Sequence, residues 1–292
     1  MERSTVYFTK DISPESLVRI YRTLGRELKG KVAVKISTGE AGNNNYLQPS
    51  LIKPLVDLLN GTITECCTAY NGKRMDPLEH WQTIREHGFD VMPCDILDEE
   101  SDMEIPVSAG YHLSVDIVGM DLQNYDSILI LSHFKGHPMG GFGGALKNMS
   151  IGIASSRGKA HIHSAGKSDD VATIWQNCAP QDDFLEAMAD ACSGVIDYIG
   201  KENVVYISVA NRLSVDCDCV AHPEEPKMGD LGIFASTDPV ALDRACYDAV
   251  VNSDDPGKVH LIERMNTRNA LHIVEAAKHL GLGTDLYELV EL

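Results

Sequence analysis

The sequence predicts an α/β protein in which helices flank a mostly parallel sheet. Three observations support this prediction. Strand-like and helix-like segments alternate along the 292 residues, which is the order that builds a parallel sheet with crossover helices. The segments KVAVKI (31–36) and DSILILSHF (126–134) read as buried strands. Helices open on a capping side chain followed by proline, as at Ser13-Pro14 and Asp76-Pro77, because proline lacks an N–H that the first helical turn would leave unpaired.

In the first half of the chain, β-branched residues mark the strands, and Pro and Gly mark the helix ends. A loop rich in Gly and Asn follows the first strand, and Gly88 ends the helix that starts at Pro77. The expected elements, in order, are a helix at 14–28, a strand at 31–36, a helix at 49–59, a strand at 61–66, a helix at 77–87, strands near 104–118 and the strand at 126–134.

The second half continues the alternation after a glycine-rich turn. A helix follows that turn, and a polar stretch at 155–181 separates it from the next helix. The expected elements are helices at 143–153 and 182–200, strands at 203–209 and 230–236, helices at 239–252 and 269–280, and YELVEL at the end as an edge strand. We expect one domain over residues 1–292. A weak candidate for a boundary between two lobes lies near 155–181. Two Rossmann-like lobes around a cleft are the alternative.

Composition narrows the classes of function. The chain carries 25 basic and 43 acidic residues, a net charge of −18, and its lysines and arginines are scattered. Such a chain repels phosphate polymers, so we expect no nucleic-acid partner. No apolar run is long enough to span a bilayer and the N-terminus lacks a signal-peptide pattern, so we expect no membrane partner and a cytoplasmic location. Eight cysteines in a leaderless chain read as free thiols or ligands.

Two unusual loops follow predicted strands. Ser37-Thr38-Gly39-Glu40 follows the first strand, and His133-Phe134-Lys135-Gly136-His137 follows DSILIL. Ligands of open α/β sheets lie beyond the carboxyl ends of the strands. If these strands are parallel neighbours, the two loops line one crevice.

The segment SHFKGHPMGGFGGALKN (132–148) combines glycines, lysines and histidines. Gly140, Gly141, Gly143 and Gly144 allow a ligand to approach the backbone, and the following helix offers N–H groups to an anion. Lys35, Lys135, Lys147 and Asn148 are further candidate ligand-binding residues. The spacing matches neither a Walker A motif nor a dinucleotide fingerprint, so a phosphate site, a carboxylate site and a tight strand-to-helix crossover all stay open.

Histidines occur in two close pairs. His133 and His137 lie in the same loop, and His161 and His163 are two residues apart, which on an extended segment would place both on one side. Neutral imidazoles in pairs suit zinc, nickel, copper or iron, whereas single histidines are more often structural.

Asp216-Cys217-Asp218-Cys219 is the densest cluster of potential metal ligands. On a strand its thiols would face one way and its carboxylates the other. The thiol pair suits a soft metal, with His222 as a nearby third ligand. No second CxxC or CxC pair accompanies it, and the alternative is a turn with inert thiols.

Several segments together resemble the DUF362 family, an uncharacterised group of microbial proteins that are often described as iron–sulfur related. The resemblance is carried by KISTGEAGNNNYLQP, TAYNGKRMDPLEHWQTIREHGF, SHFKGHPMGGFGGALKNMSIGIASSRGKAHIHSAG, VDCDC and DLGIFASTDPVALDRA. Iron–sulfur members of the family carry a ferredoxin-like insert after the segment that matches KAHIHSAG. Here KSDDVATIWQNCAPQDD stands in that place with one cysteine, Cys178, so we expect no 4Fe–4S cluster from this chain alone.

The resemblance assigns no catalytic role. The positions that match family motifs are Lys35, His133, Lys135, His137, Lys147, Asn148, His163, Asp216, Cys217, Asp218, Cys219, Asp238 and Asp243. We expect Asp238 to cap a helix, while Asp243 faces either solvent or the cleft.

Three functions remain as hypotheses. The first is a metal-dependent enzyme that acts on a small anionic molecule. In it Cys217, Cys219, His163, Asp216 and Asp218 supply metal ligands for zinc or iron, and His133, Lys135 and His137 are the catalytic candidates. The second is a redox or iron–sulfur-associated module that partners a separate ferredoxin-like protein. The third is a small-molecule or phosphate binder without turnover.

Overall fold

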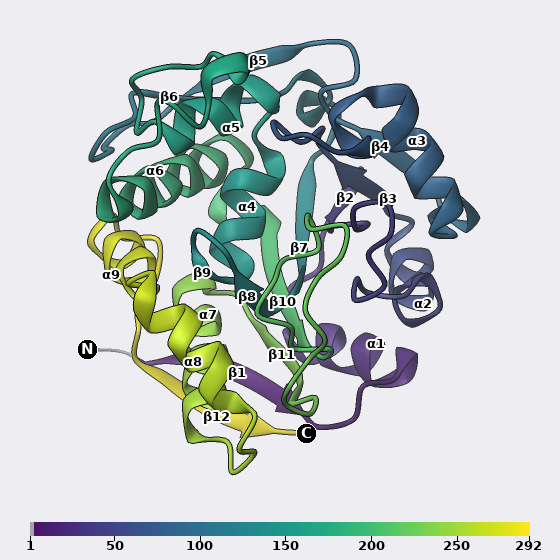
Figure 1. The fold of residues 1–292 in the computed structure, drawn as a ribbon. Coiled ribbons are helices and arrows are strands. Elements are labelled where there is room, and N and C mark those ends of the chain that lie inside the picture. Colours follow the sequence, from purple (N-terminus) through teal and green to yellow (C-terminus); the bar gives the residue numbers. More distant parts are fainter. Residues whose placement is uncertain (1–2) are drawn as a thin grey trace.

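The computed structural model describes residues 3–292 and is organised around an eight-stranded sheet (Figure 1). The strand order is β12-β1-β11-β10-β7-β2-β3-β4. These strands are β1 (Ser4–Thr9), β2 (Val32–Lys35), β3 (Thr62–Glu65), β4 (Cys94–Ile96), β7 (Ser127–His133), β10 (Val204–Ala210), β11 (Gly232–Ser236) and β12 (Tyr287–Glu291). Two hairpins stand apart from the sheet: β5 (Asp102–Pro106) with β6 (Val115–Gly119), and β8 (Lys135–His137) with β9 (Gly141–Gly143).

The sheet is mostly parallel, as the alternation of strands and helices predicts. Every neighbouring pair in it is parallel except the two pairs that β11 makes with β1 and β10. β2 and β7 are direct neighbours, with Ala33 opposite Ile128. The predicted α/β fold class is therefore confirmed.

Helices cover both faces of the sheet (Figure 1). They are α1 (Pro14–Thr23), α2 (Pro49–Leu59), α3 (Pro77–Glu86), α4 (Ala145–Ile153), α5 (Ser156–His163), α6 (Gln181–Ile199), α7 (Pro239–Asn252), α8 (Lys258–Thr267) and α9 (His272–His279). Across residues 3–292, none of them is both long enough and apolar enough to cross a membrane.

Side chains of β7 show how the layers form. All seven of its residues are buried, and successive side chains of a strand point to opposite faces. Ile128 and Ile130 join the core that α4, α6 and α7 cover, whereas Leu129 and Leu131 join the core under α1, α2 and α3. Burial on both faces explains why this segment is apolar almost throughout.

The predicted helix starts are present. Ser13 Oγ accepts a hydrogen bond from Ser16 N at 3.2 Å, and Asp76 Oδ1 accepts one from Leu78 N at 2.9 Å. Asp238 caps α7 through Val240 N and Ala241 N. Each carboxylate or hydroxyl satisfies an N–H group that the helix itself cannot pair.

Other elements differ from the prediction. β1 was not expected, and it lies between β12 and β11, so the C-terminal strand pairs with the first strand of the chain. α8 was not expected either. The stretch at 155–181, for which only a polar composition was noted, contains α5, which Ser155 caps by accepting a hydrogen bond from Gly158 N.

Candidate metal and anion site

The topology of the sheet creates a crevice between β2 and β7. After β2 the chain continues outward to β3 and β4, whereas after β7 it continues to the other side, to β10. At such a switch point the loops diverge and leave space at the carboxyl ends of the strands. Lys35, at the end of β2, and His133, at the end of β7, lie there.

Asn148 on α4 connects the two strands at this point. Its Nδ2 donates to the carbonyl oxygen of Lys35 at 3.0 Å and to that of Leu131 at 3.3 Å. It also lies 3.2 Å from Ser132 Oγ. The amide therefore satisfies backbone carbonyls that the diverging strands leave unpaired.

The HFKGH segment and the DCDC segment meet above the crevice. Gly136 N donates to Ser214 O at 2.8 Å, and a Cβ on Gly136 would lie 2.4 Å from the carbonyl oxygen of Val215. Only glycine allows this close approach of two backbones. Asp218 then accepts from Lys135 Nζ at 2.6 Å and is 2.8 Å from His133 Nδ1.

The loop after β2 supports the DCDC segment from the other side. Glu40 N donates to Asp218 O at 2.7 Å, and Asn43 Nδ2 donates to Val220 O at 2.7 Å. Segments far apart in the sequence thus hold one turn, which places the thiols of Cys217 and Cys219.

Two thiols and one imidazole form a compact donor group. The ligand atoms of His137, Cys217 and Cys219 all lie within 4.8 Å of one another. His137 Nδ1 accepts hydrogen bonds from Gly140 N at 2.8 Å and Met139 N at 3.2 Å. The other ring nitrogen, Nε2, therefore forms the hydrogen bond between His137 and Cys217.

The pKa values of the two thiols are shifted in opposite directions. A hydrogen bond with Cys219 holds the pKa of Cys217 well below its usual range, and Lys147, Lys135 and His137 lower it further. The same hydrogen bond, together with burial, raises the pKa of Cys219 well above its usual range. Lys147 Nζ lies 3.8 Å from Cys217 Sγ, so a thiolate at Cys217 has a cation beside it.

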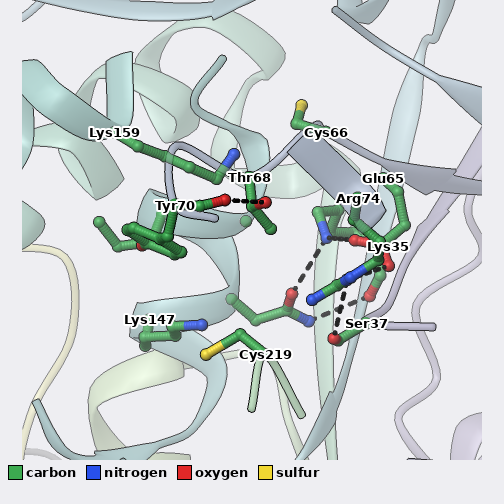
Figure 2. Close-up of a pocket in the computed structure, with 13 residues that line it drawn as sticks. Lys35, Ser37, Glu65, Cys66, Thr68, Tyr70, Arg74, Lys147, Lys159 and Cys219 are labelled. Atoms are coloured by element: carbon green, nitrogen blue, oxygen red, sulfur yellow. Dashed lines mark hydrogen bonds and ion pairs between the residues drawn. The ribbon is translucent and has the colours of Figure 1, made fainter. Parts of the chain in front are cut away.

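A pocket of about 390 Å³, its open mouth included, adjoins the thiols. Figure 2 shows Lys147 and Cys219 on one side of it and Lys35, Glu65 and Arg74 on the other. Its lining contains four basic side chains (Lys35, Arg74, Lys147 and Lys159) and one acidic side chain, Glu65. The pocket therefore favours an anion although the whole protein is strongly acidic.

Ion pairs account for part of this positive charge. Glu65 lies 2.9 Å from Arg74 Nη1 and 3.5 Å from Lys35 Nζ, and both cations lower its pKa although burial opposes this. Burial lowers the pKa of Lys35. Lys147 and Lys159 have no carboxylate partner within ion-pair distance among residues 3–292, so they are the cations that a bound anion would meet.

A second hollow continues the first toward β8. It shares Ser37, Lys147 and Asn148 with the first pocket and adds Ser132, His133, Lys135, Gly143 and Gly144. The crevice therefore runs from Lys159, past the thiols, to the HFKGH segment.

The chain matches one known protein family. The family described as a domain of unknown function (DUF362) matches residues 32–248. The chain belongs to the DUF362 family. No curated protein matches the chain.

Two solved structures show a distant similarity to the chain. One is the lactate racemase apoprotein from Thermoanaerobacterium thermosaccharolyticum, at 14% identity and a TM-score of 0.49, covering 84% of this chain and 56% of that one. The other is a protein from Thermotoga maritima, at 14% identity and a TM-score of 0.46, covering 81% of this chain and 57% of that one. The DUF362 chain thus spans little more than half the length of either protein. At these scores neither structure bears on the site.

The DCDC segment of this DUF362 chain is a turn and not a strand. Its two carboxylates therefore do not share a face. Asp218 points to His133 and Lys135, whereas Asp216 accepts from Glu224 N at 3.0 Å and lies 3.4 Å from Arg264 Nη1. Both carboxylates already have cationic neighbours from this chain, and the thiols between them face His137.

The second histidine pair lies on a helix, so the extended segment considered for it is wrong. His161 and His163 are both on α5. His163 Nδ1 is 2.6 Å from Lys159 O, and the ring packs against Phe184 with centroids 4.8 Å apart. Burial lowers its pKa to about 4. His222 lies beside Gly42, and the imidazole that joins the thiols is that of His137.

The glycine-rich segment has mainly backbone roles. Gly140 lies in the turn between β8 and β9, and Gly141, the first residue of β9, has a φ of +79° that suits glycine. Ala145 N and Leu146 N, at the start of α4, donate to Asp243 at 2.7 and 2.9 Å. Asp243 is fully buried, so it faces neither solvent nor the cleft, and it occupies the helix N-terminus at which a ligand anion was considered.

Several residues that line the pocket were not predicted from the sequence. Arg74 follows β3 and could have been found, because that strand also ends at the crevice. Tyr70 lies in the same loop after β3 as Arg74. Lys159 could not have been found, because the short helix α5 reaches the pocket only through the tertiary fold.

Proposed function

We propose that this DUF362 protein is a metal-dependent enzyme that acts on a small anionic molecule. One observation carries the proposal: Cys219, a member of the three-residue donor group, also lines the pocket with four basic side chains. A metal at the thiols and an anion at the lysines would be in contact. Membership of the DUF362 family does not identify a reaction.

The donor group fits a thiophilic divalent ion. Two thiolates and one imidazole are a set that zinc accepts in catalytic sites, where a fourth position stays open to substrate. Lys135 and Lys147 favour the thiolate form of Cys217, which a metal requires. The hydrogen bonds of His137 are less typical of a metal ligand. A histidine that binds metal normally donates its second N–H to a partner, but its Nδ1 accepts from two backbone N–H groups, so Nε2 carries the proton of the neutral ring and must release it.

The remaining residues have roles in binding and proton transfer. When bound, the metal would act as a Lewis acid toward an oxygen of the substrate. Lys147 and Lys159 would bind the anionic group. Lys35, whose pKa burial lowers, is suited to exchange a proton at Nζ with a bound molecule. Burial raises the pKa of Tyr70 well above its usual range, which keeps its hydroxyl a hydrogen-bond donor.

Metal analysis tests the proposal directly. Protein purified without oxygen should contain zinc or iron at near one ion per chain from this site, and Cys217→Ser or Cys219→Ser should remove that ion. Cys178→Ser is the matched control, because Cys178 is exposed and outside the donor group. Zinc added to the metal-free protein should release protons, including that of His137 Nε2. Equal metal content in the wild-type protein and in the Cys217 and Cys219 variants would overturn the proposal.

The anion pocket needs its own test. Thermal-shift measurements with phosphate and small carboxylates should show stabilisation that Lys147→Gln and Lys159→Gln reduce. Lys53→Gln, on the outside of α2, should not change it. If no anion stabilises the wild-type protein, the substrate class is wrong even where the metal is present.

One observation favours a second function, that of a redox-active thiol pair. The hydrogen bonds to His137 Nδ1 direct an N–H at Cys217 in the metal-free protein, and the neighbouring Cys219 could resolve an oxidised sulfur. Oxidation of the Cys217 thiolate with the Cys219 thiol would form a disulfide, release one proton, and pass one electron to each of two ferredoxin-like partner molecules. Mass spectrometry after mild oxidation distinguishes the two functions. Rapid disulfide formation in protein that binds no zinc would favour the redox function.

A further inference from the structure

We propose a second metal site, for zinc or a similar divalent transition ion, on the outside of the protein where α6, α9 and the loop at 107–114 meet. Its ligands are His112, Asp183 and Glu186, with His272 as the fourth. This site is separate from the thiols, and its existence does not depend on the proposed enzyme.

Two imidazoles converge on one carboxylate at this place. His112 Nε2 lies 2.7 Å from Glu186 Oε2, and His272 Nε2 lies 2.9 Å from Glu186 Oε1. The ligand atoms of His112, Asp183 and Glu186 all lie within 4.8 Å of one another. Around a tetrahedral zinc, with bonds of about 2.0–2.1 Å, neighbouring ligand atoms are about 3.3 Å apart. The two contacts between an imidazole and Glu186 need to lengthen by less than about 1 Å to admit the ion, and His272, which lies outside the compact group of three, would need to move toward His112 and Asp183.

The loop that carries His112 is fixed by a buried carboxylate. Asp190 accepts hydrogen bonds from the backbone N–H groups of Tyr111, His112 and Leu113, at 2.7, 2.7 and 2.9 Å. Asp190 is fully buried, and it lies one helical turn after Glu186 on α6. The same helix therefore supplies two ligands and holds the loop of a third.

The positions of the other ligands are also fixed by the fold. Asp183 and Glu186 are three residues apart on α6 and so share a face of the helix. The turn before His272 is tied to the start of α6, because Asn269 Nδ2 donates to Asp182 Oδ1 at 2.8 Å and Gln181 Nε2 donates to Arg268 O at 2.9 Å.

A neighbouring carboxylate completes the pattern of a metal-bound histidine. His272 Nδ1 lies 3.6 Å from Glu275 Oε2. When Nε2 binds a metal, Nδ1 carries the proton and a carboxylate partner is the usual acceptor. The side chains of His112, Glu186 and His272 are 24%, 20% and 24% exposed, so an ion can reach them from solvent.

Nitrogen and oxygen donors without thiols define the class of ion. Two imidazoles and two carboxylates suit zinc, and also nickel or cobalt, better than the all-oxygen sites of calcium or magnesium. The ion would join α6, α9 and the loop at 107–114, and thus act as a structural clamp.

Calorimetric titration with zinc tests the site in a Cys217→Ser, Cys219→Ser protein, from which the thiol site has been removed. We expect one zinc ion per chain, with affinity lowered at least about tenfold by His112→Ala or His272→Ala and about tenfold by Glu275→Gln. His279→Ala, which alters a histidine at the other end of α9, is the control and should leave the affinity unchanged. Equal affinity in the His112 and control variants would overturn the proposal.

Cobalt spectra of the wild-type protein provide a second measurement, in case the double cysteine variant does not fold. Cobalt at this site should give a spectrum without thiolate-to-metal charge transfer, which His112→Ala removes, whereas cobalt at the thiols gives that charge transfer. If every bound cobalt shows thiolate bands, the second site does not exist. Absence of thiolate bands from the wild-type protein would contradict the proposed function and leave this site intact, whereas loss of the thiolate bands alone in Cys217→Ser is expected if the two sites are separate.

Discussion

Replacing Lys147 by methionine should raise the pKa of the Cys217 thiol. The substitution removes the ammonium that lies 3.8 Å from Cys217 Sγ and keeps the length of the side chain. At this separation the attraction between unit charges is about 4 kcal/mol for an effective dielectric constant of about 20. Lys147 is only partly buried, so water screens about half of it. The remaining 2 kcal/mol or so corresponds to a rise of about 1.5 pKa units.

Thiolate absorbance in the far ultraviolet measures this change in metal-free, reduced protein. The difference between the wild-type spectrum and that of Cys217→Ser, followed over pH, gives the titration of Cys217. Buried thiols at Cys66, Cys192 and Cys246 do not interfere, because burial raises their pKa well above the usual range.

The outcome decides whether Lys147 stabilises the thiolate. We expect the midpoint to move upward in Lys147→Met and to stay in place in Lys53→Met, which removes an exposed lysine paired with Asp57. The same midpoint in both variants would refute the electrostatic reasoning. A downward shift would mean that Lys147 does not face the sulfur in solution.

Two further predictions concern stability, and urea unfolding checks both. Gly136→Ala should destabilise the protein by about 1–3 kcal/mol, because the added Cβ would lie 2.4 Å from Val215 O; Gly229→Ala, whose Cβ would meet nothing nearer than 3.5 Å, should cost less, and equal losses would contradict the close approach. Burial lowers the pKa of His163 to about 4 from an ordinary 6.5, so the folded state binds fewer protons than the unfolded state between these values, and stability should fall by about 3 kcal/mol as pH decreases from about 6.5 to about 4. His163→Gln should lose this part of the dependence, and parallel profiles for the variant and the wild-type protein would argue against a buried neutral imidazole.

The sequence carries enough information to predict the parallel part of the sheet. The segments at 31–36 and 126–134 became β2 and β7 because β-branched and apolar residues bury both of their faces. Their loops contain the polar residues that end up in the crevice, as the rule for open α/β sheets predicts.

The part of the sheet around β1 is harder to predict from sequence. β1 has only two buried residues among six, and it is fixed by pairing with β11 and β12, which come more than 220 residues later. Such pairing leaves no local pattern. α5 has a capping serine but few apolar residues, so its helix depends on tertiary burial, as short helices commonly do.

The candidate site was only partly accessible to sequence reasoning. Its residue types suggested that thiols and histidines act together, but the DCDC segment is a turn, so strand alternation could not identify which side chains meet. Gly136 illustrates the missing information. Its role follows from the position of Val215, which no spacing rule predicts.

The Asn148 amide has a consequence for how a ligand enters. Because this one side chain joins Lys35 O to Leu131 O, and because β2 and β7 are paired beneath it, the two walls of the crevice are parts of one rigid body. They cannot open like a hinge without breaking the sheet itself. The anion pocket lies beside this fixed base, at Lys35 and Asn148, and its other lining comes from loops and helices, so admission of a ligand depends on the DCDC turn and the segment at 68–74. Exchange with solvent would thus be set by the motion of these loops above a base that does not move.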